Sequence, residues 1–225
     1  MKKLVLVMAG LGLLWVTSAN AGEYEIDKIH SHVGFSVKHI LSMVPGNFRE
    51  FKGIFSYDEK KPEASQLKVA IAAASVYTGT QKRDEHLKSP DFFDAKKYPT
   101  ISFESRKVTS SGGKKLKVEG DLIMHGIKKP VSLDVEYLGT DSIMGMDSIG
   151  FSATTKIDRR DFNLTWGQDK MSAAGNLVVG NQVDIRLDIT GLSRASIEKM
   201  KKMQKQKPVK KLAPKKETKK ESKKK

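Results

Sequence analysis

The sequence contains no cysteine among its 225 residues. We therefore expect no disulfide bond, no lipid-modified N-terminal cysteine and no thiol nucleophile. It also lacks a long hydrophobic run, because the apolar stretch over residues 4–16 is shorter than the about 20 residues that a membrane-spanning helix needs. Three enzyme motifs are missing as well, namely the G-x-S-x-G elbow, H-E-x-x-H and a glycine-rich phosphate loop. These absences disfavour an enzyme and favour a fold that core burial alone holds together.

The N-terminus has the pattern of an export signal. Lys2 and Lys3 precede the apolar stretch, and Ala19-Asn20-Ala21 forms a small-residue cleavage site. The pattern predicts cleavage of residues 1–21 after Ala21 and a periplasmic location for the remaining chain.

The net charge of +15 is unevenly distributed along the chain. Residues 194–225 hold 15 of the 41 basic residues and 3 of the 26 acidic ones, whereas residues 22–193 hold 24 basic and 23 acidic residues. This predicts one nearly neutral domain over 22–193 and a lysine-rich, largely disordered tail over 194–225, with a weak amphipathic helix from about Ser196. The tail either only increases solubility or attaches the protein to an anionic membrane or envelope surface. Export argues against a nucleic-acid partner.

Alternating apolar and polar residues predict eight strands in the domain. In each strand every second position is apolar, as in Val33, Phe35 and Val37. One apolar and one polar face is typical of an antiparallel sheet, and about eight such strands indicate a sandwich or a closed barrel. The alternation does not distinguish these two folds. The expected strands include residues 33–37, 51–55, 69–73, 101–103, 116–122, 131–137, 151–157 and 183–189.

Residues 83–94, RDEHLKSPDFFD, break this pattern with charges and aromatic side chains. Thr78 and Gln81 have the spacing of a capping box and predict a short helix from near Gly79. Ser89-Pro90 should end the helix, because the residue before a proline avoids helical angles. We expect a charged helical lid whose following phenylalanines, Phe92 and Phe93, plug one end of the β structure, with a new strand near Thr100.

Six segments together resemble the YceI-like family, which consists of exported lipocalin-like barrels that bind polyisoprenoid lipids. The resemblance implies an elongated eight-stranded antiparallel barrel, a lumen that takes an isoprenoid or quinone-like lipid without any other cofactor, and the capacity to form homodimers. The matching segments are residues 83–94 and residues 24–39 (YEIDKIHSHVGFSVKH), 46–53 (GNFREFKG), 98–103 (YPTISF), 120–131 (GDLIMHGIKKPV) and 150–166 (GFSATTKIDRRDFNLTW).

The resemblance and the alternation together select the candidate ligand-binding residues. Gly120 and Ala153, on inward faces, should leave room for a chain, and a polar head would lie near Lys38, Lys82 or Arg83. The lid and mouth are predicted at His39, Arg83, His86, Phe92 and Phe93. The predicted lumen residues are Phe35, Val37, Phe51, Phe55, Ile71, Phe103, Val118, Leu122, Leu133, Val135, Phe151, Ile185 and Leu187.

Three alternatives stay open at this point. The interior aromatics could simply fill the barrel, which would leave an envelope stress or interaction protein that binds no lipid and is attached through its tail. His30 and His32, two apart on a predicted strand, could share a metal, although no third ligand is evident. Residues 139–148, GTDSIMGMDS, replace a glycine- and tryptophan-containing loop frequent in the family and could alter the mouth of the barrel or the ligand preferred.

Two charged groups could also suggest acid–base chemistry. The first is Asp84, Glu85 and His86, and the second is Asp158 and Asp161 beside Arg159 and Arg160. We interpret the acids as favourable charges at a helix start, and the arginines as partners of nearby carboxylates that pin loops.

Overall fold

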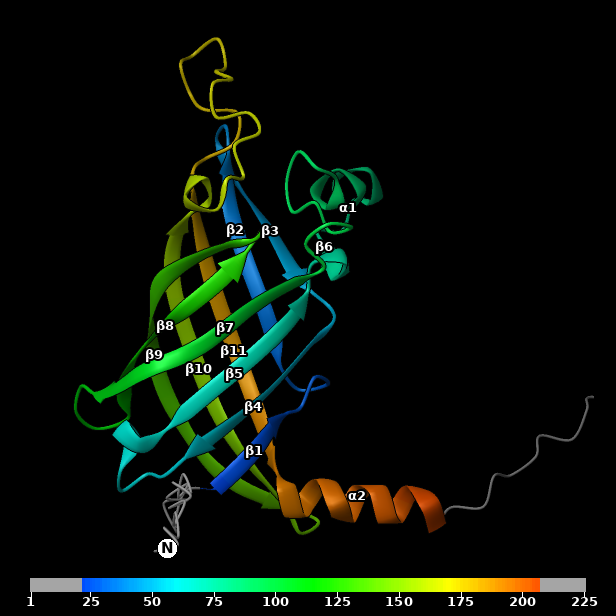
Figure 1. Ribbon diagram of the computed structural model, residues 1–225, viewed down its shortest axis with the longest axis vertical. Coiled ribbons are helices and arrows are strands. Elements are labelled where there is room, and N and C mark those ends of the chain that lie inside the picture. The colour runs from blue at the N-terminus through cyan, green and yellow to red at the C-terminus, as the bar shows by residue number, and fades with distance from the viewer. Residues whose placement is uncertain (1–21, 207–225) are drawn as a thin grey trace, which may run out of the picture.

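The computed structural model describes residues 22–206. The predicted export signal and the predicted tail beyond residue 206 lie outside this part of the chain. Within it, eleven strands form one antiparallel sheet in the order β1-β4-β5-β7-β8-β9-β10-β11-β2-β3-β6. A further pairing between β1 and β11 closes the sheet into an eight-stranded barrel (Figure 1). The strands are β1 (Gly22–Ile26), β2 (His32–His39), β3 (Ser42–Phe48), β4 (Phe51–Tyr57), β5 (Gln66–Ala72), β6 (Val76–Tyr77), β7 (Thr100–Ser110), β8 (Lys115–Met124), β9 (Ile127–Ile143), β10 (Met146–Asp158) and β11 (Gln182–Ser193).

In the closed barrel, four of the labelled strands combine in pairs, and each pair takes the place of one long strand. Strands β1 and β2 follow one line, because both pair with the same edge of β11: β1 near Gly191 to Ser193, and β2 between Val183 and Asp188. Strands β3 and β4 form the next line, since β4 pairs with β1 and β3 pairs with β2. The sheet therefore has no free edge where β1 and β11 meet, which is how barrels avoid edge-to-edge aggregation.

The predicted closed antiparallel barrel is confirmed, and so are the eight predicted strands. Their inward residues form one continuous apolar core that includes Ile101, Phe103, Val118, Leu122 and Leu133. The sequence analysis missed β1, β3 and β6. Strand β3 is hidden by Pro45 and Gly46, both poor strand formers, and β6 has only two residues.

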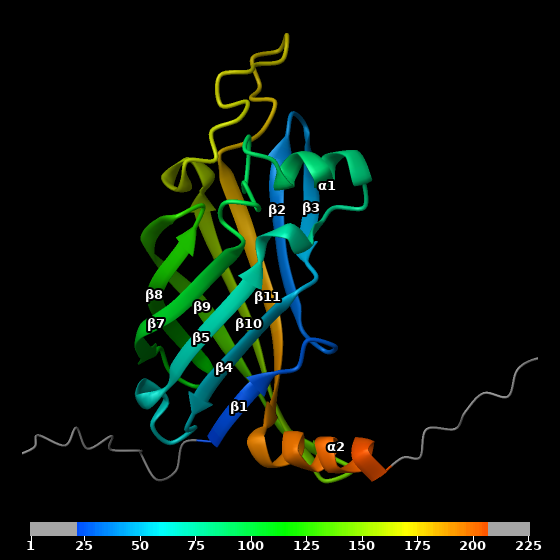
Figure 2. The ribbon, with the colours of Figure 1, turned by 45° about the vertical axis from the view of Figure 1, so that its right-hand side comes forward.

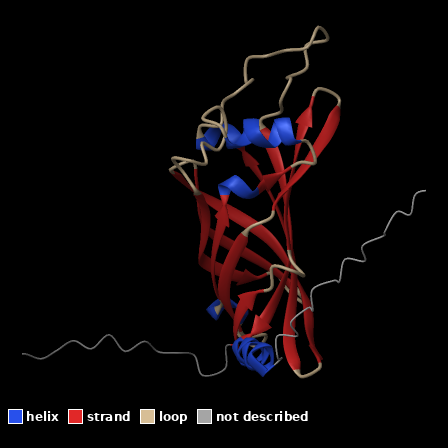
Figure 3. Cartoon of the chain, turned by 90° about the vertical axis from the view of Figure 1, so that its right-hand side faces the viewer, coloured by secondary structure: helices blue, strands red, loops and turns tan. Residues whose placement is uncertain are grey.

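The two α-helices lie at opposite ends of the barrel (Figures 1 and 2). Helix α1 (Gln81–Lys88) contacts β6 at the end where β7 begins, and α2 (Arg194–Gln206) contacts β1, β10 and β11 at the other end. Figure 3 looks nearly along the axis of α2, and Figure 1 shows that this helix projects sideways from the end of β11. We refer to the two ends as the lid end and the α2 end. Neither helix in residues 22–206 is long and apolar enough to cross a lipid bilayer.

The predicted helix near Ser196 is present and begins two residues earlier than expected. It is packed onto the barrel through Ser196, which is 2% exposed. The Ser196 hydroxyl accepts a hydrogen bond from the Asp147 amide at 2.7 Å, and Arg194 pairs with Glu23 at 2.8 Å. The first part of the basic segment is therefore an ordered element of the barrel.

Residues 139–148, which the sequence analysis suggested could alter the mouth of the barrel, lie at the end opposite the lid. They form the paired ends of β9 and β10, joined by a tight turn at Met144 and Gly145. This hairpin lies at the α2 end, where the Lys199 ammonium donates to the Met144 carbonyl at 3.0 Å. The hairpin therefore contacts α2 and lies far from the lid.

Candidate ligand-binding cavity

An apolar cavity of about 270 Å³ lies inside the barrel, and the surface that it exposes carries no polar atom. Its wall is uneven. Phe35, Val37, Ile185 and Leu187, on β2 and β11, face the cavity and keep part of their surface accessible. Residues on β7 and β8, such as Phe103, face it but are buried by their neighbours. The open space therefore lies nearer to β2 and β11 than to β7 and β8.

Most residues predicted to face the lumen do line this cavity. Phe51 is the exception, because it is buried but does not reach the cavity wall. Whether the lining residues contact a lipid stays a prediction. Those on the wall are Phe35, Val37, Phe55, Ile71, Phe103, Val118, Leu122, Leu133, Val135, Phe151, Ile185 and Leu187.

Inward phenylalanine rings lie flat against glycines of neighbouring strands, which keeps them out of the lumen. A Cβ atom on Gly120 would lie 2.5 Å from Cζ of Phe103, and one on Gly191 would lie 2.8 Å from Cε1 of Phe55. Gly120 therefore makes room for the Phe103 ring against the barrel wall, and the Phe103 ring rather than Gly120 lines the cavity. Ala153 does line the cavity, as expected.

An aromatic cluster closes the cavity toward the α2 end. Phe55, Tyr57 and Phe151 face the cavity, with ring centroids of Phe151 5.7 Å from Phe55 and 5.1 Å from Tyr57. Tyr24 stacks on Phe55 at 5.3 Å, and Tyr137 packs against Tyr57 at 5.0 Å. Neither Tyr24 nor Tyr137 lines the cavity, so both lie behind the first layer of rings. We call these five residues the aromatic floor.

The buried position of the floor affects the titration of Tyr57. Burial, followed by the neighbouring Tyr137 phenol and the Glu59 carboxylate, raises the pKa of Tyr57 from 10.0 to about 12. A raised phenol pKa means that the folded state holds its proton more tightly than the unfolded chain does. This contribution to stability is complete below pH 10 and is lost as the pH rises toward 12.

We expect Tyr57→Phe to make the fold less sensitive to alkali. Between pH 10 and pH 12 the wild type should lose up to about 2 kcal/mol more unfolding free energy than the variant, because only the wild type must ionise this buried phenol. Urea unfolding at pH 8, 10, 11 and 12 measures the difference. Parallel losses in both proteins would show that the Tyr57 hydroxyl is not held neutral by the fold.

At the lid end the cavity wall is completed by the segment after α1. Phe92 and Phe93 both line the cavity, and the Phe93 ring packs edge-on against Phe48 at 5.5 Å. This is the arrangement that the sequence predicted for the aromatic end of the lid. Trp166, from the loop before β11, packs on Phe92 at 5.4 Å and therefore links the lid to that loop.

The other predicted mouth residues do not reach the cavity. His39 ends β2 and is exposed. Nε2 of His86 lies within hydrogen-bond distance of Asp91 Oδ2, at 2.8 Å, and the His86 ring packs against the Trp166 ring, so His86 supports the lid from outside. Arg83 turns back to its own loop, donating to the Thr78 hydroxyl at 2.7 Å and the Thr78 carbonyl at 2.8 Å.

The start of α1 differs from the capping box that the sequence suggests. The helix begins at Gln81 after Thr80, whose side chain makes no capping bond. Thr78 contacts the buried Asp84 instead, with its amide donating to Asp84 Oδ1 at 2.8 Å and its hydroxyl at 2.5 Å. The end of the helix at Ser89 agrees with the prediction. Asp84 therefore holds the loop that precedes α1 against the helix, and Arg83 also bonds Thr78 in this loop.

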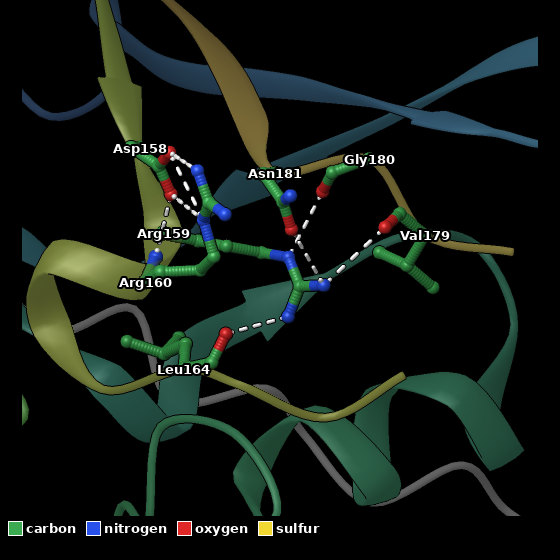
Figure 4. Close-up of polar contacts among 7 residues, drawn as sticks. All are labelled: Asp158, Arg159, Arg160, Leu164, Val179, Gly180 and Asn181. Atoms are coloured by element: carbon green, nitrogen blue, oxygen red, sulfur yellow. Dashed lines mark hydrogen bonds and ion pairs between the residues drawn. The ribbon is translucent and has the colours of Figure 1, made fainter. Parts of the chain in front are cut away.

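Arg159 is the most buried charged side chain at the lid end, with an exposure of 4% (Figure 4). Its five N–H groups all donate, and no carboxylate is among the acceptors. They reach the carbonyl oxygens of Leu164 (2.5 Å), Trp166 (2.9 Å), Val179 (3.3 Å) and Gly180 (2.9 Å) and the side-chain oxygen of Asn181 (3.3 Å). Burial lowers the pKa of this guanidinium.

Arg159 therefore clamps the two ends of the loop that joins the 3₁₀ helix η3 (Arg159–Phe162) to β11. The sequence analysis placed Arg159 among loop-pinning arginines but predicted a carboxylate partner, which is true only of Arg160. Arg160 pairs with Asp158 at 2.6 Å, and this hydrogen bond is the main cause that lowers the pKa of Asp158. Because every donor of Arg159 is engaged, it has none left for a ligand head group.

The histidine pair does not form the expected strand face. His30 lies in the turn before β2 and contacts Asp27 at 2.6 Å, while His32 is the first residue of β2. Across residues 22–206, no three histidine, aspartate or glutamate side chains gather as metal ligands. The two histidines therefore do not share one face of a strand, and the suggested strand-based metal site at His30 and His32 is wrong.

A closed antiparallel barrel of eight strands around one apolar cavity defines the class of lipocalin-like barrels, which can hold a single small ligand. The chain belongs to the YceI-like family, because the model of the YceI-like domain matches residues 24–191. Among relatives, a UPF0312 protein of Pseudomonas putida is 41% identical over 159 residues, covering 69% of this chain and 83% of its own length. A UPF0312 protein of Vibrio vulnificus is 38% identical over 164 residues, covering 70% and 87%.

Solved structures share the same architecture. BcnA of Burkholderia cenocepacia superposes with a TM-score of 0.66 at 25% identity, covering 73% of this chain and 98% of its own. The YCEI protein of Campylobacter jejuni has a TM-score of 0.60 at 29% identity, covering 85% and 98%. A polyisoprenoid binding domain from Saccharophagus degradans has a TM-score of 0.55 at 16% identity, covering 76% and 98%, and at that identity it supports the fold alone.

Proposed function

We propose that this protein binds a long-chain isoprenoid or a similar amphiphilic lipid in the barrel, and that it carries or stores this lipid in the periplasm after cleavage behind Ala21. The apolar cavity between lid and aromatic floor is the observation that carries the proposal. A wall without exposed polar atoms suits a hydrocarbon tail and nothing that needs hydrogen bonds. A core filled by its own side chains would leave no such space.

The physical chemistry of transfer favours this ligand class. A long apolar chain cannot cross an aqueous compartment unaided, and its burial contributes on the order of 0.8 kcal/mol per methylene group. Ordering of the chain opposes part of that gain, so the sum is larger than the binding free energy. A polar head group would stay at the lid end, near exposed bases such as Lys38 and Lys82.

Lipid extraction tests the proposal directly. Protein purified from its native source is extracted with organic solvent, and the extract is analysed by mass spectrometry. A prenyl lipid recovered in a near-stoichiometric amount is the expected result. Repeated extracts without any lipid, from protein that is shown to be folded, would contradict the proposal.

We expect Val135→Phe to reduce lipid uptake strongly. Val135 lines the cavity and pairs with Ala153 on the neighbouring strand, so an added ring would occupy the lumen. Fluorescence titration with a prenyl lipid should show at least a tenfold weaker Kd, while the melting temperature changes little because the ring enters empty space. The matched control is Glu136→Phe, which adds the same ring at the exposed neighbouring position. Equal uptake by both variants would contradict a lumenal site.

A second candidate function is attachment to an anionic surface through the basic C-terminal segment. Helix α2 carries five basic residues and one acidic residue, and it lies at the end of the barrel opposite the lid (Figure 1). Each basic residue near an anionic membrane contributes about 1 kcal/mol.

Removal of residues 207–225 is expected to abolish most salt-sensitive binding to vesicles that contain anionic lipid, because 10 basic residues are lost. The deletion spares Ser196 and its contacts with the barrel, so the melting temperature should be unchanged. Neutral vesicles serve as the control in a sedimentation assay. Undiminished binding by the shortened chain would exclude this segment as the attachment site.

A further inference from the structure

We infer that the aromatic floor sets the maximum length of the chain that the lumen accepts. This inference rests on the proposed lipid binding and adds a specificity to the same site. Its basis is the layered closure of the cavity at the α2 end, where one layer of rings faces the lumen and a second layer lies behind it.

The first layer consists of the three rings of the floor that line the cavity, Phe55, Tyr57 and Phe151. Phe151 is central, because its ring meets both other rings of this layer and also Tyr137 behind them, at 5.5 Å. Removal of the Phe151 ring would therefore open the centre of the first layer toward Tyr137.

Behind Phe151 the side chains are fully packed. Tyr137 is 4% exposed and Ile149 is 1% exposed, and neither lines the cavity. Ile149 pairs with Gly191 on β11, and beyond it Ser196 of α2 is bonded to Asp147. A chain that enters from the lid end and reaches Phe151 therefore meets packed side chains in the direction of α2.

A hydrogen bond of the Tyr137 hydroxyl holds the outer end of this floor residue in place. It donates to the Glu59 carboxylate at 3.4 Å, so the ring body faces the interior while the polar tip reaches the barrel rim. A ring held at its outer end resists displacement by an apolar chain better than an untethered side chain.

This geometry predicts a sharp length optimum. Each additional methylene group increases affinity as long as it finds apolar space, and the first group that meets the floor must displace packed rings. Affinity should therefore rise with chain length up to one value and then fall.

The test uses the full-length protein and a series of prenols that differ by single isoprene units, with Kd measured by fluorescence displacement. Phe151→Ala should move the optimum to longer chains and bind the first length that the wild type excludes at least tenfold more tightly. The matched control, Phe35→Ala, removes the same ring from the wall near the lid end. It should weaken binding of all lengths and leave the optimum in place.

The outcomes separate this inference from the proposed function. Failure of the wild type to bind any prenol would contradict lipid binding itself. Normal binding with an unmoved optimum in Phe151→Ala, or equal shifts in both variants, would overturn the floor as the length limit. Phe151→Leu provides a milder opening if the alanine variant does not melt cooperatively. Leu116→Phe, which adds a ring at a lining position next to Val135, should shift the optimum to shorter chains.

Discussion

Replacement of Arg159 by methionine is expected to cost at least about 3 kcal/mol of unfolding free energy. The variant removes all five hydrogen bonds of the guanidinium and leaves carbonyl groups at both ends of the loop before β11 without their donor. An unpaired buried polar group costs about 1–3 kcal/mol, and several are created together. Denaturant unfolding measures the loss, and hydrogen exchange should show that it begins in residues 163–181.

Arg160→Met is the matched control, because it removes the same side chain one residue further along. Arg160 is exposed and pairs with Asp158 at the surface, where ion pairs contribute about 0–1 kcal/mol. The two variants should therefore differ several-fold in their effect. Arg159→Lys should not rescue the fold, since an ammonium has three donors and lacks the planar fork that reaches both ends of the loop. Similar losses in the two methionine variants would contradict the clamp.

Phe103→Asp is expected to unfold most of the chain. Phe103 is 8% exposed, belongs to the continuous core and lines the cavity opposite β11. The introduced carboxylate would lie within the apolar core cluster, and burial of an unpaired charge costs more than about 4 kcal/mol. Loss of the buried ring costs about 3–5 kcal/mol more. Domains of this size are typically stable by about 5–15 kcal/mol, so the two costs together should leave little folded protein at neutral pH.

The control and the pH dependence make this prediction specific. Glu104→Gln changes the next residue on β7, which faces outward and pairs with Lys68 at the surface, so it should cost less than about 1 kcal/mol. The introduced carboxyl should have a raised folded pKa, because burial disfavours its charged form. Part of the lost stability should therefore return as the pH falls below that pKa. A folded variant at neutral pH would show that the Phe103 position is open to water.

The strands could be predicted because their signal is local. Period-two alternation over residues 116–122 or 183–189 places one face inward whatever the neighbouring strands are. The end of α1 at Ser89 was equally predictable, since the following proline restricts the backbone. The start of α1 was not, because the Thr78 side chain is used by Asp84, and the two come together only after the loop has folded.

The sequence by itself determined an apolar and a polar face for eight strands, a neutral domain followed by a basic segment, and an aromatic lid. The tertiary structure decided everything that depends on distant segments. Pairing of β1 with β11 closes the barrel, and it brings together the rings of the aromatic floor from strands β1, β4, β9 and β10. The folded loop before β11 gives Arg159 its carbonyl partners, and the position of Phe51 along β4 keeps it out of the cavity wall. Alternation fixes which face a residue occupies, but its position along the lumen follows only from strand register and closure.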